Sequence, residues 1–205
     1  DCEQYCSKYC TDTHASIEFC CMSVQGICQV LLSHGMLAFK PMITLRPAET
    51  KDIEILWTLQ KEAFLPLWER YHDAGNPYLR GPVDIRTRLF SPQYHCFCIL
   101  DDAQIIGGIL YATMTNEIER EYYLQRLFIA PERQNQGIGR KAIALCEHEL
   151  ADATLFSVEF PQDLEKNRTC YTKAGFKDTG RRVKTEEGIV LARFEKRIIH
   201  PCSGK

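Results

Sequence analysis

From residue 42 onward, the spacing of hydrophobic positions switches repeatedly between a helical period and a strand period. Apolar residues three and four apart indicate helices, whereas short apolar runs between turn residues indicate strands. The predicted strands span 42–48, 94–100, 105–114, 120–130, 154–160 and 186–198. The predicted helices lie within 48–74, 84–90, 139–152 and 163–175. This order predicts one α/β domain with a mixed, mostly antiparallel sheet and helices on both faces.

A polar segment with two glycines joins the strand that ends at Ala130 to a helix that starts at about Ile138. Its Q-x-x-G-x-G pattern consists of Gln134, Gly137 and Gly139. A helix N-terminus has unpaired N–H groups and partial positive charge, which suits an anion such as a pyrophosphate. Cations stand near the pattern at Arg133, Arg140 and Lys141. The alternative is a glycine-containing turn that binds no ligand.

Two segments of the chain resemble a known family. The segment "LQRLFIAPERQNQGIGRKAI" closely resembles the acetyl-CoA-binding segment of the GCN5-related N-acetyltransferases, or GNAT family. About thirty residues later, "NRTCYTKAGFKDTG" resembles that family's N-x-x-x-Y-x-x-x-G-F segment. The resemblance covers residues 42–198, and "QKEAFLPLWERY" is similar to the first helix of an uncharacterised branch. It implies a GNAT-like fold, acetyl-CoA as cosubstrate, and direct acetyl transfer to a primary amine in a ternary complex.

The resemblance also implies a role for each matching residue. The strand before the loop would splay from its neighbour and bind the pantetheine arm through Leu127, Phe128 and Ile129. The loop residues that would hold the pyrophosphate are Gln134, Asn135, Gln136, Gly137, Ile138, Gly139 and Arg140. Asn167 matches a residue that reaches the cofactor arm, and Tyr171 matches the tyrosine that protonates the departing thiolate. A phenol held beside a thiolate can supply that proton, but Tyr171 could instead pack its helix against the sheet.

The general base is less well defined than the general acid. Family members often carry a glutamate four residues before the position of Leu127, and this chain has Tyr123 there. Strand alternation predicts one common face for Glu121, Tyr123, Gln125, Leu127 and Ile129. Glu121 is therefore the candidate base, with a solvated strand end as the alternative. Glu159, at the end of the next strand, is the candidate for binding a cationic acceptor, and Tyr123 would border it.

Composition adds three points to this picture. The 205 residues carry a formal charge of −2 and 45% hydrophobic residues, so nucleic acid is not an expected partner. No apolar run is long enough for a membrane span, and no signal peptide is recognisable, so a cytoplasmic protein is expected. Six of the eleven cysteines lie in the first 28 residues. The expected division is therefore a cysteine-rich extension (1–41), an acetyltransferase domain (42–200) and a short tail (201–205).

The extension allows three interpretations. A helix would align Cys2, Cys6 and Cys10, and three thiolates with His14 or another cysteine can bind zinc, although no metal site is assigned. The stretch 16–35 is amphipathic and predicts a helix that packs on the acetyltransferase domain or on a second copy in a homodimer. In the third interpretation, the native enzyme starts at Met42 and the extension is incidental.

The sequence thus favours an acetyl-CoA-dependent N-acyltransferase that acts on a small-molecule or peptide amine. One alternative is a non-catalytic acyl-CoA-binding or regulatory module, which the missing glutamate at Tyr123 favours. Another is an acetyltransferase fused to a thiol-rich metal-binding segment.

Overall fold

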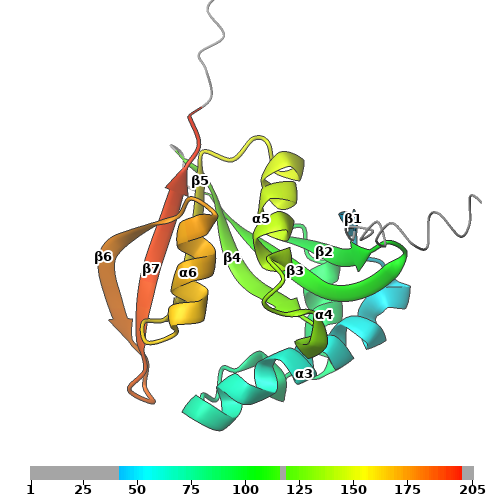
Figure 1. The fold of residues 1–205 in the computed structure, drawn as a ribbon, viewed down its shortest axis with the longest axis horizontal. Helices are drawn as coiled ribbons and strands as arrows, with labels where there is room; N and C mark the ends of the chain where they lie inside the picture. The colour runs from blue at the N-terminus through cyan, green and yellow to red at the C-terminus, as the bar shows by residue number, and fades with distance from the viewer. Residues whose placement is uncertain (1–41, 116–118, 200–205) are drawn as a thin grey trace, which may run out of the picture. The chain divides into compact units, whose positions relative to one another are not determined.

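A twisted sheet runs through the centre of the protein (Figure 1). The computed structural model describes residues 42–115 and 119–199, so the cysteine-rich extension and the 201–205 tail lie outside the described residues. The strands are β1 (Ile43–Pro47), β2 (Tyr94–Asp101), β3 (Gln104–Thr115), β4 (Arg120–Ile129), β5 (Leu155–Pro161), β6 (Lys177–Lys184) and β7 (Val190–Arg197). Their order in the sheet is β1-β2-β3-β4-β5-β7-β6. Among the described strands, only β4 and β5 pair in parallel, which confirms the mostly antiparallel sheet.

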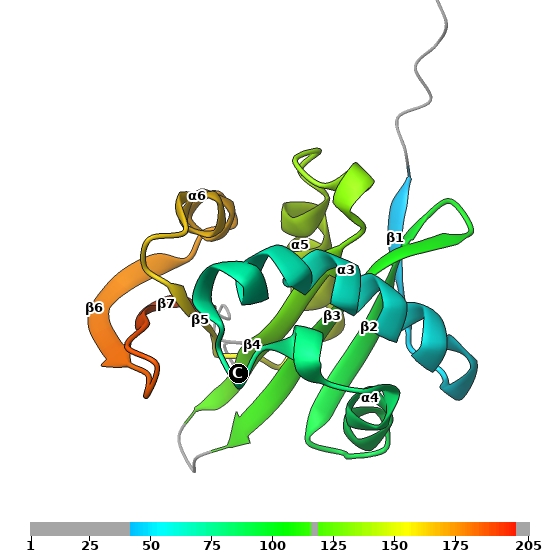
Figure 2. The same cartoon turned by 90° about the horizontal axis from the view of Figure 1, so that it is seen from below.

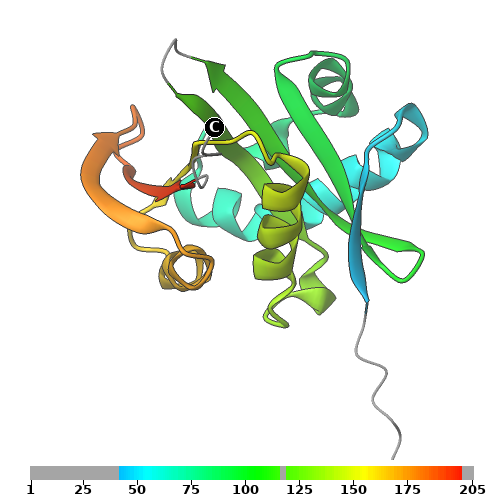
Figure 3. The ribbon, with the colours of Figure 1, turned by 90° about the horizontal axis from the view of Figure 1, so that it is seen from above.

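Helices cover both faces of the sheet (Figures 2 and 3). The α-helices are α3 (Ile53–Tyr71), α4 (Pro82–Leu89), α5 (Ile138–Glu149) and α6 (Glu165–Lys173). Short 3-10 helices are η1 (Thr50–Asp52), η2 (Pro77–Leu79) and η3 (Pro131–Arg133). Helices α3 and α4 share one core with the sheet, and α5 and α6 share the other. In the part of the chain that the structure describes, no helix is both long and apolar enough to cross a membrane.

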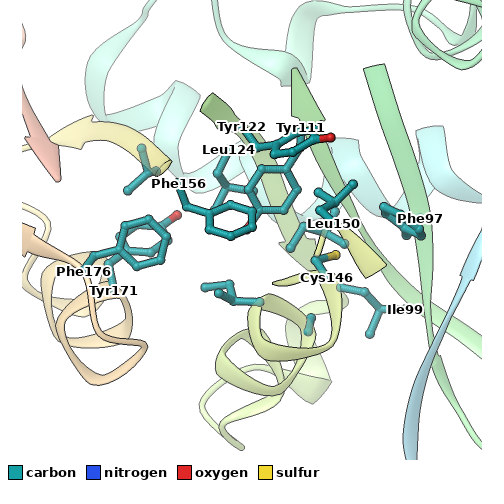
Figure 4. Packing of buried hydrophobic residues seen from close by; sticks show 14 of the residues in the cluster. Phe97, Ile99, Tyr111, Tyr122, Leu124, Cys146, Leu150, Phe156, Tyr171 and Phe176 are labelled. Carbon is teal, nitrogen blue, oxygen red and sulfur yellow. The ribbon is translucent and has the colours of Figure 1, made fainter. Parts of the chain in front are cut away.

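The larger core lies between the sheet and helices α5 and α6. Aromatic rings from three neighbouring strands meet there: the Tyr111 and Phe156 ring centroids are 5.6 Å apart, and those of Tyr122 and Phe156 are 5.9 Å apart (Figure 4). Cys146 of α5 packs beside them and is fully buried. Apolar burial on this scale supplies much of the stability of a domain. This core fixes α5, and therefore its N-terminus, against β4.

One strand was not predicted from the sequence. All eight residues of β6 are exposed, so the segment lacks the alternation of buried and exposed positions that marks a half-buried strand. It pairs only with β7 and forms one edge of the sheet. The charged side chains along it are typical of edge strands, which must avoid pairing with other molecules.

A β-bulge interrupts β4. Leu110 of β3 pairs with Arg126, but the next residue, Tyr111, pairs with Leu124, so Gln125 is an extra residue in β4. An extra residue bends the strand and changes which way the following side chains point. The bulge lies where β4 begins to separate from β5.

The bulge overturns one prediction from the sequence. Alternation predicts a common face for Glu121, Tyr123, Gln125, Leu127 and Ile129. In the structure, Leu127 and Ile129 contact the core beneath α5 and α6, on the same side as Tyr122. Glu121 and Tyr123 alternate with Tyr122 and therefore lie on the opposite face. The prediction is wrong because it assumes an unbroken strand.

Candidate active site

The parallel strands β4 and β5 pair over only part of their lengths. Pairing runs from Glu121 opposite Leu155 to Leu124 opposite Val158, and both strands then continue without each other. Beyond this point the backbone edges that face each other have no strand partner. A cleft of about 540 Å³ occupies the divergence, and residues of α3, the η3–α5 loop and α6 complete its walls.

Most of the site residues predicted from the sequence line this cleft. Those that do are Leu127, Phe128, Ile129, Gln134, Asn135, Gly137, Ile138, Gly139, Glu159, Asn167 and Tyr171. Those that do not are Glu121, Tyr123, Gln136 and Arg140. Residues more than forty positions apart in the sequence are thus brought to one cavity. The two catalytic candidates are separated, because Tyr171 lies in the wall and Glu121 does not.

The loop before α5 has the geometry of an anion site. Gly137 is the N-cap of α5 and has a φ of 76°, in the left-handed region that favours glycine. A glycine has no side-chain oxygen, so Gly137 cannot accept a hydrogen bond from the N–H groups in the first turn of the helix. Lys166 lies nearby and donates to Gln134 Oε1 at 2.7 Å. Unpaired N–H groups, helix polarity and a cation together suit a phosphate group.

Tyr171 projects from α6 into the opposite wall. Its ring packs against Phe160 and Phe176, with centroids 5.1 Å and 5.9 Å away, and its hydroxyl is directed toward the central strands (Figure 4). Burial raises the pKa of Tyr171 above the usual value of 10, with smaller contributions from Cys170 and Tyr123. The phenol therefore keeps its proton at neutral pH, as a general acid must.

Glu121 belongs to a cluster of carboxylates around Arg193 of β7. The guanidinium donates to Glu121 at 2.6 Å and to Glu195 at 2.8 Å, and it lies 3.5 Å from Glu159. Three carboxylates therefore share one cation, which leaves two formal negative charges. Ser157 also donates to Glu121. Glu159 is the member of this cluster that reaches the cleft.

Tyr123 lies beside this cluster without lining the cleft. Burial raises its pKa to about 12, and the charge of Glu159 adds to the shift. A tyrosine here stays neutral and cannot act as the carboxylate base that the family resemblance leads us to expect at this position.

A buried arginine on the floor of the cleft was not predicted from the sequence. Arg126 follows the bulge, and its side chain is 6% exposed. Its Nη1 donates to Gln60 Oε1 at 2.8 Å and to Asp84 Oδ2 at 2.6 Å. Arg88 donates to the same Asp84 carboxylate. A charged residue within the apolar run "YYLQRLFIA" was the available signal, because buried charges require partners.

Helix α3 supplies a wall to which the sequence assigned no role. Phe64, Pro66 and Leu67 line the cleft from this side. Pro66 has no N–H, so the carbonyl of Glu62 lacks its usual helical partner. These three residues form an apolar part of the wall, and the helical hydrogen-bond ladder is broken beside the cavity.

No metal centre is found in the described residues, where no three His, Cys, Asp or Glu side chains are grouped to hold an ion. The zinc hypothesis concerns Cys2, Cys6 and Cys10, which lie outside the described residues. It stays a prediction.

Comparison with known proteins is consistent with this geometry. A family model described as "Acetyltransferase (GNAT) domain" matches residues 80–198. Among curated proteins, the chain is 24% identical over 139 residues to the uncharacterized protein YrkN of Bacillus subtilis, covering 67% of this chain and 74% of that protein. The match to a relative without an assigned activity adds no substrate.

Solved structures share the fold. An acetyltransferase from Thermus thermophilus superposes with a TM-score of 0.60 at 19% identity, covering 77% of this chain and 97% of that one. A spermidine N-acetyltransferase from Vibrio cholerae, solved with CoA and spermine, gives a TM-score of 0.61 at 18% identity, covering 76% and 95% of the two chains.

Proposed function

The chain belongs to the GNAT acetyltransferase family, and from that premise we propose that it transfers an acetyl group from acetyl-CoA to a primary amine. The observation that carries the proposal is the cleft between the diverging strands β4 and β5. It has an uncapped helix N-terminus at one wall, a buried phenol at another and a carboxylate on β5. The solved relative from Vibrio cholerae binds CoA and a polyamine in the same fold.

The residues present suit CoA. The Gly137–Arg140 backbone supports the pyrophosphate interpretation because its N–H groups lack a capping side chain. Leu127 and Ile129 have no strand partner on the β5 side, although the Ile129 carbonyl accepts from Gln134 Nε2 at 3.0 Å, and an extended pantetheine arm can use this edge. Acetyl-CoA supplies the thioester, and Asn167, which lines the cleft, is the residue proposed to contact its arm.

The chemistry then requires three proton movements: two protons leave the acceptor nitrogen and one reaches the departing sulfur. Glu159 attracts the ammonium group of the acceptor and takes a proton from it, which frees the nitrogen lone pair to attack the thioester carbon. As the carbon–nitrogen bond forms and the carbon–sulfur bond breaks, Tyr171 donates its phenolic proton to the departing sulfur. The acetylated nitrogen then loses its second proton to solvent, solvent returns a proton to the tyrosinate, and Glu159 releases its proton to solvent. Glu121 as direct base stays a prediction, and its contacts with Ser157 and Arg193 point instead to a supporting role.

The test compares two tyrosines of the same core. Tyr171→Phe keeps the ring and removes the acid, so kcat should fall by roughly tenfold or more with acetyl-CoA affinity nearly unchanged. Tyr111→Phe is the matched control, because Tyr111 is fully buried, lies outside the cleft and has a hydroxyl without a hydrogen-bond partner among the described residues. Steady-state release of CoA, measured over a panel of amines, gives kcat. Equal rates for wild type and Tyr171→Phe would make Tyr171 a packing residue.

A non-catalytic acyl-CoA-binding module is the second candidate. It is favoured by the engagement of Glu121 with Arg193 and by the tyrosine at position 123. A binder would show acetyl-CoA affinity in calorimetry without CoA release toward any amine. The same two assays therefore separate a sensor from an enzyme.

A further inference from the structure

The guanidinium of Arg126 makes hydrogen bonds along one edge, while the donors of its other edge have no protein acceptor among the described residues. The group carries five N–H donors. Nη1 makes both of its bonds, to Gln60 and Asp84. Nε and Nη2 find no acceptor among residues 42–115 and 119–199. Within those residues, the fully buried side-chain atoms without a partner belong to Asp101, Tyr111 and Glu147, so the free donors of Arg126 are not completely buried, and Arg126 is one of the residues that line the cleft.

The network around Arg126 carries a net positive charge. Arg126 and Arg88 share the single carboxylate of Asp84, so one formal positive charge remains. Burial lowers the pKa of Arg126, while its bonds to Asp84 oppose that shift, and a guanidinium stays charged in any case. Gln60 is fully buried and is itself fixed by a bond to the Pro77 carbonyl at 2.9 Å. The guanidinium is therefore held in one orientation before any ligand arrives.

Arg126 and Glu159 lie across the divergence from each other. The last β4–β5 pair is Leu124 with Val158, so Glu159 is the next residue of β5 and Arg126 is two residues along β4. Both side chains lie on the face of the sheet opposite the α5–α6 core, because their strand neighbours Leu127 and Val158 pack in that core. The cleft thus carries a positive charge at Arg126 on β4 and a negative charge at Glu159 on β5. The other charged side chains of α3 at the cleft, Glu62 and Arg70, are exposed, and Arg70 is paired with Asp163 at 2.6 Å.

We propose that the acceptor is an amine that also carries a carboxylate, which Arg126 binds through Nε and Nη2 while Glu159 receives the ammonium group. This inference rests on the proposed transfer reaction and names its substrate class. A planar guanidinium binds a carboxylate through two parallel hydrogen bonds, and both bonds are strengthened by charge. The bond would also satisfy donors that are otherwise costly to bury.

The experiment uses matched amines on the full chain. L-Phenylalanine, β-alanine and γ-aminobutyrate are compared with phenethylamine, ethylamine and propylamine, which lack only the carboxylate. At least one acid should show kcat/KM about tenfold above its partner, the effect expected of a charged bidentate pair. Arg126→Gln should remove that preference by slowing the acid alone. In this variant, Asp84 still forms its ion pair with Arg88, so its charge is not left without a partner. Arg46→Gln, which breaks an ion pair outside the cleft, should leave the preference intact.

Failure of this inference differs from failure of the transfer reaction. If the carboxylate-free amines react as well as the acids, or if the preference survives in Arg126→Gln, Arg126 does not recognise the acceptor. If no amine causes release of CoA, the melting temperature is measured with CoA and each acid bound, and this shift shows whether Arg126 binds the acid. Acids that stabilise wild type but not Arg126→Gln support the Arg126 site and refute only transfer, whereas no Arg126-dependent shift refutes both. If Arg126→Gln does not fold, Arg126→Lys, which keeps the charge but loses the planar fork, should lower the preference severalfold.

Discussion

Gly137 acts through its backbone conformation. Its φ of 76° sets the turn into α5, and a Cβ there would meet only the end of the Arg140 side chain, at 3.2 Å. Space inside the protein is therefore not what requires glycine. The positive φ favours glycine, and the proposed pyrophosphate site would add a second reason, because the ligand would have to approach the loop amides.

Gly137→Val should weaken acetyl-CoA binding at least tenfold, which corresponds to about 1.4 kcal/mol. The reason is that the branched side chain covers the amides and disfavours the left-handed conformation. Calorimetric titration with acetyl-CoA gives the affinity.

Gly180→Val is the matched control for backbone strain. Gly180 has a φ of 78°, has nothing within 4 Å of its Cβ position and lies in β6 outside the cleft. This variant should lose similar stability and bind acetyl-CoA normally. Wild-type affinity in Gly137→Val would remove the phosphate role of the loop.

At the scale of elements, β3 and β4 approach each other unusually closely beside the cleft. A Cβ at Gly107 of β3 would lie 2.2 Å from the Phe128 carbonyl oxygen and 3.1 Å from the Ile129 Cα. Both are backbone atoms of β4, so no side-chain movement can relieve the contact. The glycine lets β4 lie against β3 at the place where it has left β5.

Gly107→Ala should therefore lower the free energy of unfolding by about 2 kcal/mol or more, because the two strands must move apart. Urea denaturation followed by circular dichroism measures this. Gly81→Ala is the control, since nothing lies within 4 Å of that Cβ position. If both variants unfold at the wild-type midpoint, the close approach has no energetic role.

The start of α3 is connected to β1 by a buried ion pair. Arg46 Nη1 lies 2.6 Å from Asp52 Oδ2, and the Asp52 side chain is 4% exposed. The hydrogen bond from Arg46 is the main cause that lowers the pKa of Asp52 from 3.8 to about 2. A lowered carboxyl pKa stabilises the fold above the unfolded value, and this stabilisation is lost as the pH falls from about 4 to 2.

Arg46→Gln should lower the unfolding free energy at pH 7 by about 2 kcal/mol, and the difference from wild type should shrink below pH 4. Thermal unfolding at a series of pH values tests this. Lys51→Gln removes an exposed pair with Glu49 and should have no such effect. A constant difference between Arg46→Gln and wild type down to pH 2 would contradict the linkage.

Elements marked by local sequence could be predicted, and those that depend on distant partners could not. The start of α5 at Ile138 was predicted because the strand, loop and helix signals are contiguous. The bulge at Gln125 was missed because alternation contains no signal for one extra residue. The role of Arg126 depends on Gln60 and Asp84, which precede it by 66 and 42 positions. These three residues come into contact only in the folded protein, so no short stretch of sequence predicts their hydrogen bonds.

At the scale of the whole molecule, the strands and helices of the described residues all lie after Met42. A chain that starts at Met42 should therefore fold and keep its turnover within about twofold, as expected when an appended segment is removed. Circular dichroism, light scattering and CoA release measure folding, oligomeric state and activity.

An insoluble product or a changed molecular mass would make residues 1–41 part of the fold or of a dimer. Stoichiometric zinc in the full chain, absent from the shorter one, would instead support the metal hypothesis for the extension.

The divergence of β4 from β5 gives the protein an edge in the interior of its sheet. The outer edges at β1 and β6 end the sheet, whereas this one interrupts it. Backbone groups of β4 beyond Leu124 that face β5 lack a strand partner, so their amide protons exchange with solvent as loop amides do. An extended ligand in the gap would act as a temporary strand and slow that exchange. With such a ligand bound, the sheet would be continuous across the divergence.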